Sequence, residues 1–115
     1  MLSLNESLNY YLYPHYINMN SGIETLSELA RNMSGVNPFG GNVFLFAGKK
    51  RDMIKLLRWD RDGFILYHKR LETSTFEIPR FKPREGWNKI EWRVFMMIMS
   101  GISLDSAKFR RRLEI

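Results

Sequence analysis

The stretch Asn42–Leu71 constrains the fold more than any other part of the chain. It contains three apolar runs, over Val43–Ala47, Met53–Trp59 and Phe64–Leu71, separated by two short polar connections. Runs of this length, rich in β-branched and aromatic residues and bounded by turn residues, are typical of strands, and two short turns join such strands into an antiparallel meander. The second connection ends in Gly63, which suits a positive φ angle. The sequence therefore predicts a three-stranded antiparallel sheet at the centre of the fold.

Alternation along these runs indicates that the sheet is covered on both faces. Phe44 and Phe46 share one strand face, and Val43, Leu45 and Ala47 share the other. The two later runs are likewise apolar on both faces towards their middles and charged towards some ends. We therefore expect helices on the sheet and a basic rim around it.

A helix is predicted before the meander. Ser21 and Glu24 have the spacing of a capping box, and apolar residues from Ile23 to Met33 recur at helical spacing. Gly35 is the expected stop. Because its charged residues are mainly acidic, we interpret this helix as scaffold.

A second helix is predicted after the meander, from Lys89 to about Met99, with Asn88 as its cap and Gly101 at its end. Its broad stripe of Trp, Phe and Met residues indicates either a buried helix or an adaptable surface for a protein partner. Both interpretations stay open.

Two further strands are predicted outside the meander. Leu8–Tyr13 is the first, ended by Pro14, and Phe76–Ile78 is a short fourth strand. The tyrosines near the N-terminus either pack as an edge strand or stack on bases. The expected fold is α+β: one small domain over residues 1–115, with an antiparallel three- to five-stranded meander sheet, two main helices and a basic C-terminal tail over residues 103–115.

Charge is spread unevenly along the chain. The formal net charge is +6, but residues 1–48 sum to −2 and residues 49–115 to +8. A basic excess confined to one part of a chain favours a polyanionic partner such as nucleic acid, and the alternative is a solvated basic surface. The candidate phosphate contacts are Lys49, Lys50, Arg51, Arg58, Arg61, Lys69 and Arg70, with Arg110, Arg111 and Arg112 as an arm.

The residues that most enzymes and metal sites require are scarce. The chain has no Cys and only His15 and His68, and the acids near the sheet lie in or beside basic turns. Asp60 and Asp62 are interpreted as turn-forming residues. We expect no catalysis, no cofactor and no metal. No apolar run is long enough to span a bilayer and the N-terminus has no signal-peptide pattern, so we expect a cytoplasmic protein.

The order and spacing of residues 43–79 resemble a known family. The matching elements are a hydrophobic strand, a basic turn led by glycine, and the motifs K-L-L-x-W-D, G-F-x-L-x-x-K-R-L and F-x-x-P. Here they are Gly48, Lys55-Leu56-Leu57, Trp59-Asp60, Gly63-Phe64, Lys69-Arg70-Leu71, Phe76 and Pro79. The chain is similar to TnpB-type accessory proteins, the second open reading frame product of the IS-sixty-six group of insertion sequences. The similarity covers about residues 17–102.

This resemblance implies a non-catalytic accessory role in DNA transposition, beside a transposase and a second accessory protein as partners. The first hypothesis is that the protein binds DNA through its basic sheet rim, and the alternative is an adaptor that binds the transposase or the other accessory protein without contacting DNA. One segment departs from the family. Residues 17–23 read INMNSGI, where relatives have a pattern similar to T-D-M-R-K-G-F. The acid and both bases of that pattern are missing here.

Overall fold

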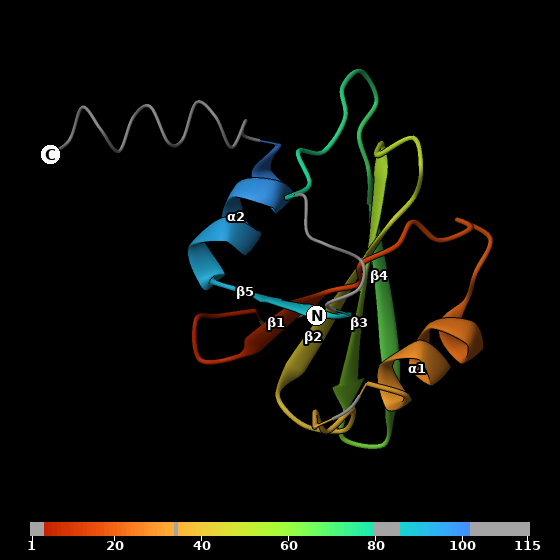
Figure 1. The fold of residues 1–115 in the computed structure, drawn as a ribbon, viewed down its shortest axis with the longest axis vertical. Coiled ribbons are helices and arrows are strands. Elements are labelled where there is room, and N and C mark those ends of the chain that lie inside the picture. The colour runs from red at the N-terminus through yellow and green to blue at the C-terminus, as the bar shows by residue number, and fades with distance from the viewer. Residues whose placement is uncertain (1–3, 34, 80–85, 102–115) are drawn as a thin grey trace, which may run out of the picture.

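A five-stranded mixed sheet with one helix on each face forms the centre of the protein (Figure 1). The computed structural model describes residues 4–33, 35–79 and 86–101. The elements in chain order are β1 (Asn9–Leu12), α1 (Ile23–Arg31), β2 (Asn42–Ala47), β3 (Met53–Asp60), β4 (Gly63–Arg70), β5 (Asn88–Ile90) and α2 (Trp92–Ser100). The α+β class and the central meander are confirmed. The predicted basic tail over residues 103–115 lies outside the described residues.

The sheet has the strand order β4-β3-β2-β1-β5, and it is more than a meander. The β2–β3 and β3–β4 pairs are antiparallel, as predicted. However, β1 pairs with β2 in parallel, with Tyr10 opposite Val43. Parallel neighbours need a crossover connection, and here that connection carries α1. The purely antiparallel prediction was therefore wrong for β1.

The first strand is also not an edge strand. On its far side β1 pairs antiparallel with β5, with Tyr10 opposite Ile90. The sequence predicts that the residues of β5 begin the second helix. They extend the sheet instead, because the free side of β1 offers them hydrogen-bonding partners. α2 then begins at Trp92, after Glu91, and ends at Gly101 in the left-handed conformation, as expected for a glycine C-cap.

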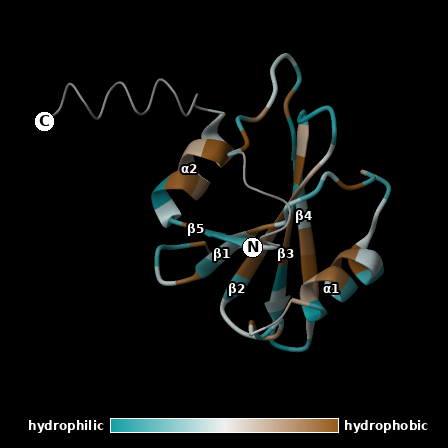
Figure 2. Cartoon of the chain, viewed as in Figure 1, coloured by the Kyte–Doolittle hydropathy of each residue, from teal (hydrophilic) through white to brown (hydrophobic). Residues whose placement is uncertain are grey.

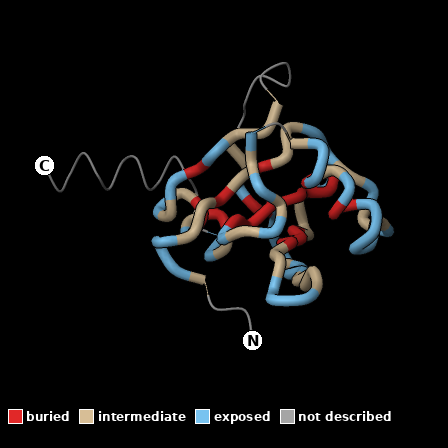
Figure 3. The backbone as a smooth tube through the Cα atoms, turned by 90° about the horizontal axis from the view of Figure 1, so that it is seen from below, coloured by how far each residue is buried: buried red, intermediate tan, exposed pale blue. Residues whose placement is uncertain are grey.

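Side chains alternate between two cores, one on each face of the sheet. Val43, Leu45 and Ala47 join Phe95 and Ile98 of α2 in one buried cluster. Phe44 and Phe46 join Leu26 and Ala30 of α1 in the other. All six residues of β2 are buried, so the buried backbone in Figure 3 forms a layer between exposed outer surfaces. The apolar residues follow the strands and helices in Figure 2, and the alternation read from the sequence is confirmed.

Three local predictions differ from the structure. Ser21 does not cap α1, because Gly22 is the N-cap and no side chain makes a capping bond. The helix ends at Arg31, before the expected stop at Gly35. Residues 76–78 form no strand: the backbone N–H of Phe76 donates to the carbonyl of Arg51 in the β2–β3 turn, and its side chain is buried in the core of the α2 face.

The turn between β3 and β4 also differs from expectation. Its positive φ of 54° falls on Arg61, and Gly63 begins β4. The backbone N–H of Asp62 donates to the carbonyl of Asp60 at 2.6 Å, which closes a γ-turn centred on Arg61. A hydrogen bond between backbone groups, rather than a glycine, therefore shapes this turn.

Candidate nucleic-acid interface

The predicted basic residues divide between the two ends of the meander. Met53 lies opposite Arg70 and Ile54 opposite Lys69, so both bases lie beside the β2–β3 turn that carries Lys49–Arg51. The other two bases, Arg58 and Arg61, lie near the β3–β4 turn. An eight-residue strand is about 23 Å from its first to its last Cα. We call the first group, Lys49, Lys50, Arg51, Lys69 and Arg70, the basic end.

The backbone of the β2–β3 turn is held on both sides of Arg51. The N–H of Arg51 donates to the carbonyl of Gly48 at 2.9 Å, and its own carbonyl accepts from the N–H of Phe76 at 2.6 Å. The N–H of Leu71 donates to the carbonyl of Asp52 at 2.7 Å. Residues 71–76 therefore brace the turn, which presents Lys49 and Lys50 as exposed side chains and Arg51 as a half-buried one.

Arg51 has a φ angle of 57°, in the left-handed region. That region costs an L-residue with a Cβ about 1–2 kcal/mol, and turns usually place Gly or Asn there. Arg61 has a φ of 54° in the other meander turn, so both turns place an arginine at a strained position. Strain of this kind is common where a side chain serves a function.

The remaining bases of the basic end have local partners. Lys69 donates from Nζ to the carbonyl of Met99 at 2.8 Å, near the C-terminus of α2, where a cation is favourable. Arg70 Nε lies 4.0 Å from Asp52 Oδ2, an exposed contact of little energetic weight. Within the part of the chain that the structure describes, neither Lys49, Lys50 nor Arg51 is paired with a carboxylate.

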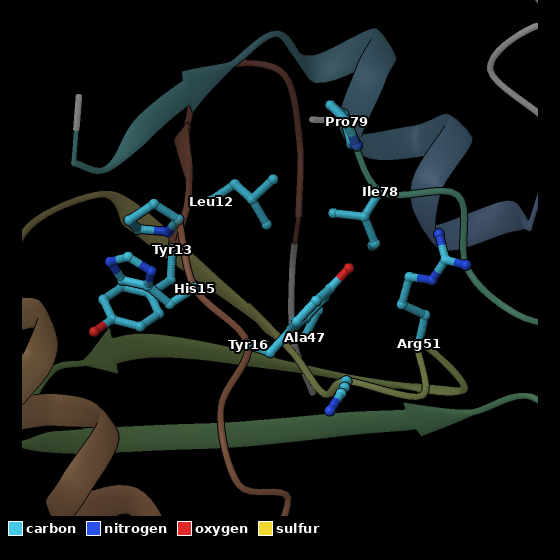
Figure 4. Close-up of a pocket in the computed structure, with 10 residues that line it drawn as sticks. Leu12, Tyr13, His15, Tyr16, Ala47, Arg51, Ile78 and Pro79 are labelled. Carbon is cyan, nitrogen blue, oxygen red and sulfur yellow. The ribbon is translucent and has the colours of Figure 1, made fainter. Parts of the chain in front are cut away.

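Two hollows flank the β2–β3 turn. The larger, about 640 Å³, is lined by residues 12–16, by Ala47, Lys49 and Arg51, and by Ile78 and Pro79 (Figure 4). The smaller, about 360 Å³, is lined by Lys49, Lys50, Arg70 and Asp52 together with residues of the β1–α1 connection. Lys49, Lys50 and Arg51 therefore line concave surface on both sides of the turn.

The tyrosines of the N-terminal segment divide between the core and the surface. Tyr10 is buried and stacks on Phe95, with ring centroids 4.2 Å apart. Its hydroxyl donates to the carbonyl of Asn5 at 2.8 Å, and burial raises its pKa above the usual 10.0. Tyr13 packs on Trp87 at 4.9 Å. Tyr13 and Tyr16 both line the larger hollow, and Tyr16, at 55% exposed, is the most exposed of these three rings.

Lys55 has a role that the sequence did not reveal. It is only 8% exposed, and its Nζ donates to the carbonyls of Met19 at 2.6 Å and Ser21 at 2.7 Å. The ammonium group thereby ties the β1–α1 connection to the sheet. The sequence feature that could have indicated this role is the position of Lys55 on a strand face that otherwise carries apolar residues. The contact with Lys55 also explains why Ser21 does not cap α1. Lys55 holds the carbonyl of Ser21, which lies one residue before the N-cap, Gly22.

In residues 4–33, 35–79 and 86–101, no group of three His, Asp or Glu side chains is placed to hold a metal ion. His68 is exposed at the end of β4, and Trp59 is half-buried and meets Phe64 edge-on at 5.0 Å. Neither described helix has the length and apolar character needed to cross a membrane. Arg110, Arg111 and Arg112 lie outside the described residues.

A family model described as "IS66 Orf2 like protein" matches residues 8–109. The chain belongs to this family. The match confirms the resemblance carried by residues 43–79 and extends beyond it at both ends. Membership associates the chain with the accessory products of IS66-type insertion sequences, whose role is in transposition.

Two relatives from Sinorhizobium fredii (strain NBRC 101917 / NGR234) are similar to this IS66 Orf2-like chain. "Uncharacterized protein y4hO" is 27% identical over 79 residues, which cover 69% of each chain. "Uncharacterized protein y4jC" is 27% identical over 96 residues, which cover 84% of this chain and 79% of the relative. No solved structure matches the chain.

Proposed function

We propose that this IS66 Orf2-like protein is a non-catalytic accessory factor in transposition that binds DNA through its basic end. The observation that carries the proposal is the β2–β3 turn, where Lys49, Lys50 and Arg51 are brought together without a carboxylate partner among the described residues. Clustered cations at a fixed turn complement the negative charge of the DNA phosphate backbone.

The braced backbone supports the same conclusion. A turn whose backbone is held by Phe76 and Leu71 loses little backbone conformational entropy when its side chains meet a ligand. Arg70 lies beside the turn and its contact with Asp52 is exposed and weak, so it is free to exchange a carboxylate for a phosphate. Lys69 contributes charge while it holds α2. Such contacts give affinity and position, and they do not select a base sequence.

The non-catalytic part of the proposal rests on the acids. Asp52 lies near Arg70, and Asp60 and Asp62 are exposed in a turn on either side of Arg61. Metal-dependent nucleases and transposases instead gather several carboxylates around their ions. Incubation of the purified protein with Mg²⁺ and element-end DNA is expected to leave the DNA intact.

The binding test is a fluorescence-anisotropy titration of labelled duplex DNA from the element ends, repeated over a range of salt concentrations. Contacts from Lys49, Lys50, Arg51 and Arg70 predict a plot of log K against log salt with a slope of about −3 to −4. The double variant Lys49→Gln/Lys50→Gln should reduce the magnitude of the slope by about 2. Absence of association at low salt refutes the proposal.

A matched control separates local contacts from bulk charge. Arg61→Gln/Lys89→Gln also removes two positive charges, from exposed positions on the β3–β4 turn and on β5. The proposal predicts that this control keeps nearly the wild-type slope. If both double variants weaken binding equally, the interaction reflects net charge and not the basic end.

The second candidate is an adaptor that binds the transposase or the second accessory protein. Its supporting observation is the exposure of two large apolar side chains: Phe39 is 46% exposed and Met96 on α2 is 45% exposed. An apolar interface is kept in high salt, where phosphate contacts are lost. Co-purification with the transposase in high salt, lost in Met96→Glu or Phe39→Glu, would support the adaptor.

A further inference from the structure

The larger hollow beside the basic end combines two of the phosphate-contacting bases with features that phosphate contacts alone do not require. It has an apolar floor that includes Leu12 and Ala47, both buried. Its lining includes the exposed aromatic ring of Tyr16 and the bases Lys49 and Arg51. Its volume, about 640 Å³, falls in the range of small-molecule sites.

Tyr16 is held in position by the backbone on either side of it. The N–H of Tyr13 donates to the carbonyl of Leu45, and the N–H of Ile17 donates to the carbonyl of Ala47, each at 2.9 Å. Residues 14–16 therefore arch away from β2 between two fixed points, and Pro14 restricts the arch further. A tyrosine that is 55% exposed on such a fixed arch adds little to the core.

The opposite wall is fixed as well. Arg51 is held by its two backbone hydrogen bonds to Gly48 and Phe76. Figure 4 shows Tyr16 and Arg51 projecting from different segments toward the segment that carries Ile78 and Pro79. An aromatic ring, an apolar floor and two cations in one hollow match a nucleotide, whose base stacks on an aromatic ring while its phosphate pairs with a cation.

We propose that this hollow binds one unpaired nucleotide, with its base stacked on Tyr16 and its phosphate paired with Lys49 and Arg51. The inference rests on the proposed DNA binding and makes it more specific. A base inside a duplex is already stacked and cannot enter the hollow. The protein should therefore prefer DNA that carries a single-stranded end or gap over a blunt duplex.

The test compares a blunt duplex with the same duplex carrying a short thymidine overhang, in separate 5′ and 3′ forms. Wild-type protein is expected to bind one overhang form more tightly than the blunt form. Tyr16→Ala should weaken binding to that form about 5- to 150-fold and leave blunt-duplex binding unchanged. Tyr16→Phe, which keeps the ring, should retain the preference.

A second readout reports stacking directly. With 2-aminopurine in the overhang, wild-type protein and Tyr16→Phe should quench its fluorescence, and Tyr16→Ala should not. Phe39→Ala is the matched control, because Phe39 is an exposed aromatic that contacts Trp59 at the other end of the meander. It should behave like the wild type in both assays, and thermal melting shows that each variant is folded.

The outcomes separate the two proposals. Failure to bind any of these DNAs at low salt refutes the DNA-binding function and this inference with it. Equal binding of blunt and overhang DNA, or a Tyr16→Ala variant that retains quenching, refutes the unpaired-nucleotide site and leaves duplex binding in place. An effect of Phe39→Ala equal to that of Tyr16→Ala assigns the preference to exposed aromatics in general and also overturns the site.

Discussion

Replacement of Arg51 by glycine tests whether the strained arginine of the β2–β3 turn serves binding at the expense of stability. Its φ of 57° is the conformation that glycine adopts freely. Its two backbone hydrogen bonds, to Gly48 and from Phe76, do not depend on the side chain. Arg51→Gly should therefore preserve the turn while it removes one cation from the basic end.

The magnitude for folding comes from a comparison with Arg51→Ala, which loses the same charge and nearly the same packing. The left-handed region costs a residue with a Cβ about 1–2 kcal/mol, and glycine loses about 0.5–1 kcal/mol through the greater freedom of its unfolded chain. The glycine variant should thus be more stable than the alanine variant by about 0.5–1 kcal/mol, measured as the free energy of unfolding in urea.

The magnitude for binding comes from the lost phosphate contact. Each contact contributes about 0.9 to the slope of log K against log salt, which is about eightfold in affinity for every tenfold dilution of salt. For duplex DNA, the slope of both Arg51 variants should be smaller in magnitude than that of the wild type by about 0.9. This should hold although the glycine variant is more stable than the alanine variant. The difference in the free energy of unfolding between the two variants would then be independent of their loss of DNA binding.

Two results would refute this reasoning. If Arg51→Ala is as stable as Arg51→Gly, the positive φ is not a source of strain in this turn. If both variants keep the wild-type salt slope, Arg51 does not contact phosphate. Arg61→Gly is the control at the other turn, where φ is 54°. It should relieve the same kind of strain and leave DNA affinity nearly unchanged.

Three further predictions concern the scaffold. Lys55→Met keeps the aliphatic stem but leaves two backbone carbonyls without their donor, so the free energy of unfolding in urea should fall by about 2–4 kcal/mol. Gly48→Ala places a Cβ 2.8 Å from Cγ of Met19, and the resulting loss of about 1–2 kcal/mol should be partly recovered by adding Met19→Ala. Burial raises the pKa of Tyr10 above 10.0 in the folded protein. The contribution of the neutral hydroxyl to the free energy of unfolding is therefore fully present below pH 10, and it is lost as pH rises through the pKa of the folded state. Tyr10→Phe should therefore show a flatter alkaline unfolding profile than the wild type.

The sequence alone determined the centre of the fold and the location of the bases. The alternation through Phe44 and Leu45 has a period of two and depends only on neighbouring residues, so it assigned each side chain to the correct face. The short turns after Ala47 and Asp60 set the antiparallel register. That register already implies that Lys69 and Arg70 lie beside Lys49, so the division of the bases into two ends was available from the sequence.

The tertiary structure decided the features that depend on partners distant along the chain. The pairing of β5 with β1 joins residues about eighty positions apart, and local signals at Asn88 favoured a helix instead. Lys55 reaches a carbonyl 36 residues away, and Phe76 braces the turn at Arg51. Local periodicity cannot predict such contacts, because they form only after the sheet and helices have packed. The arch that exposes Tyr16 and the hollow beside it arise from these same contacts.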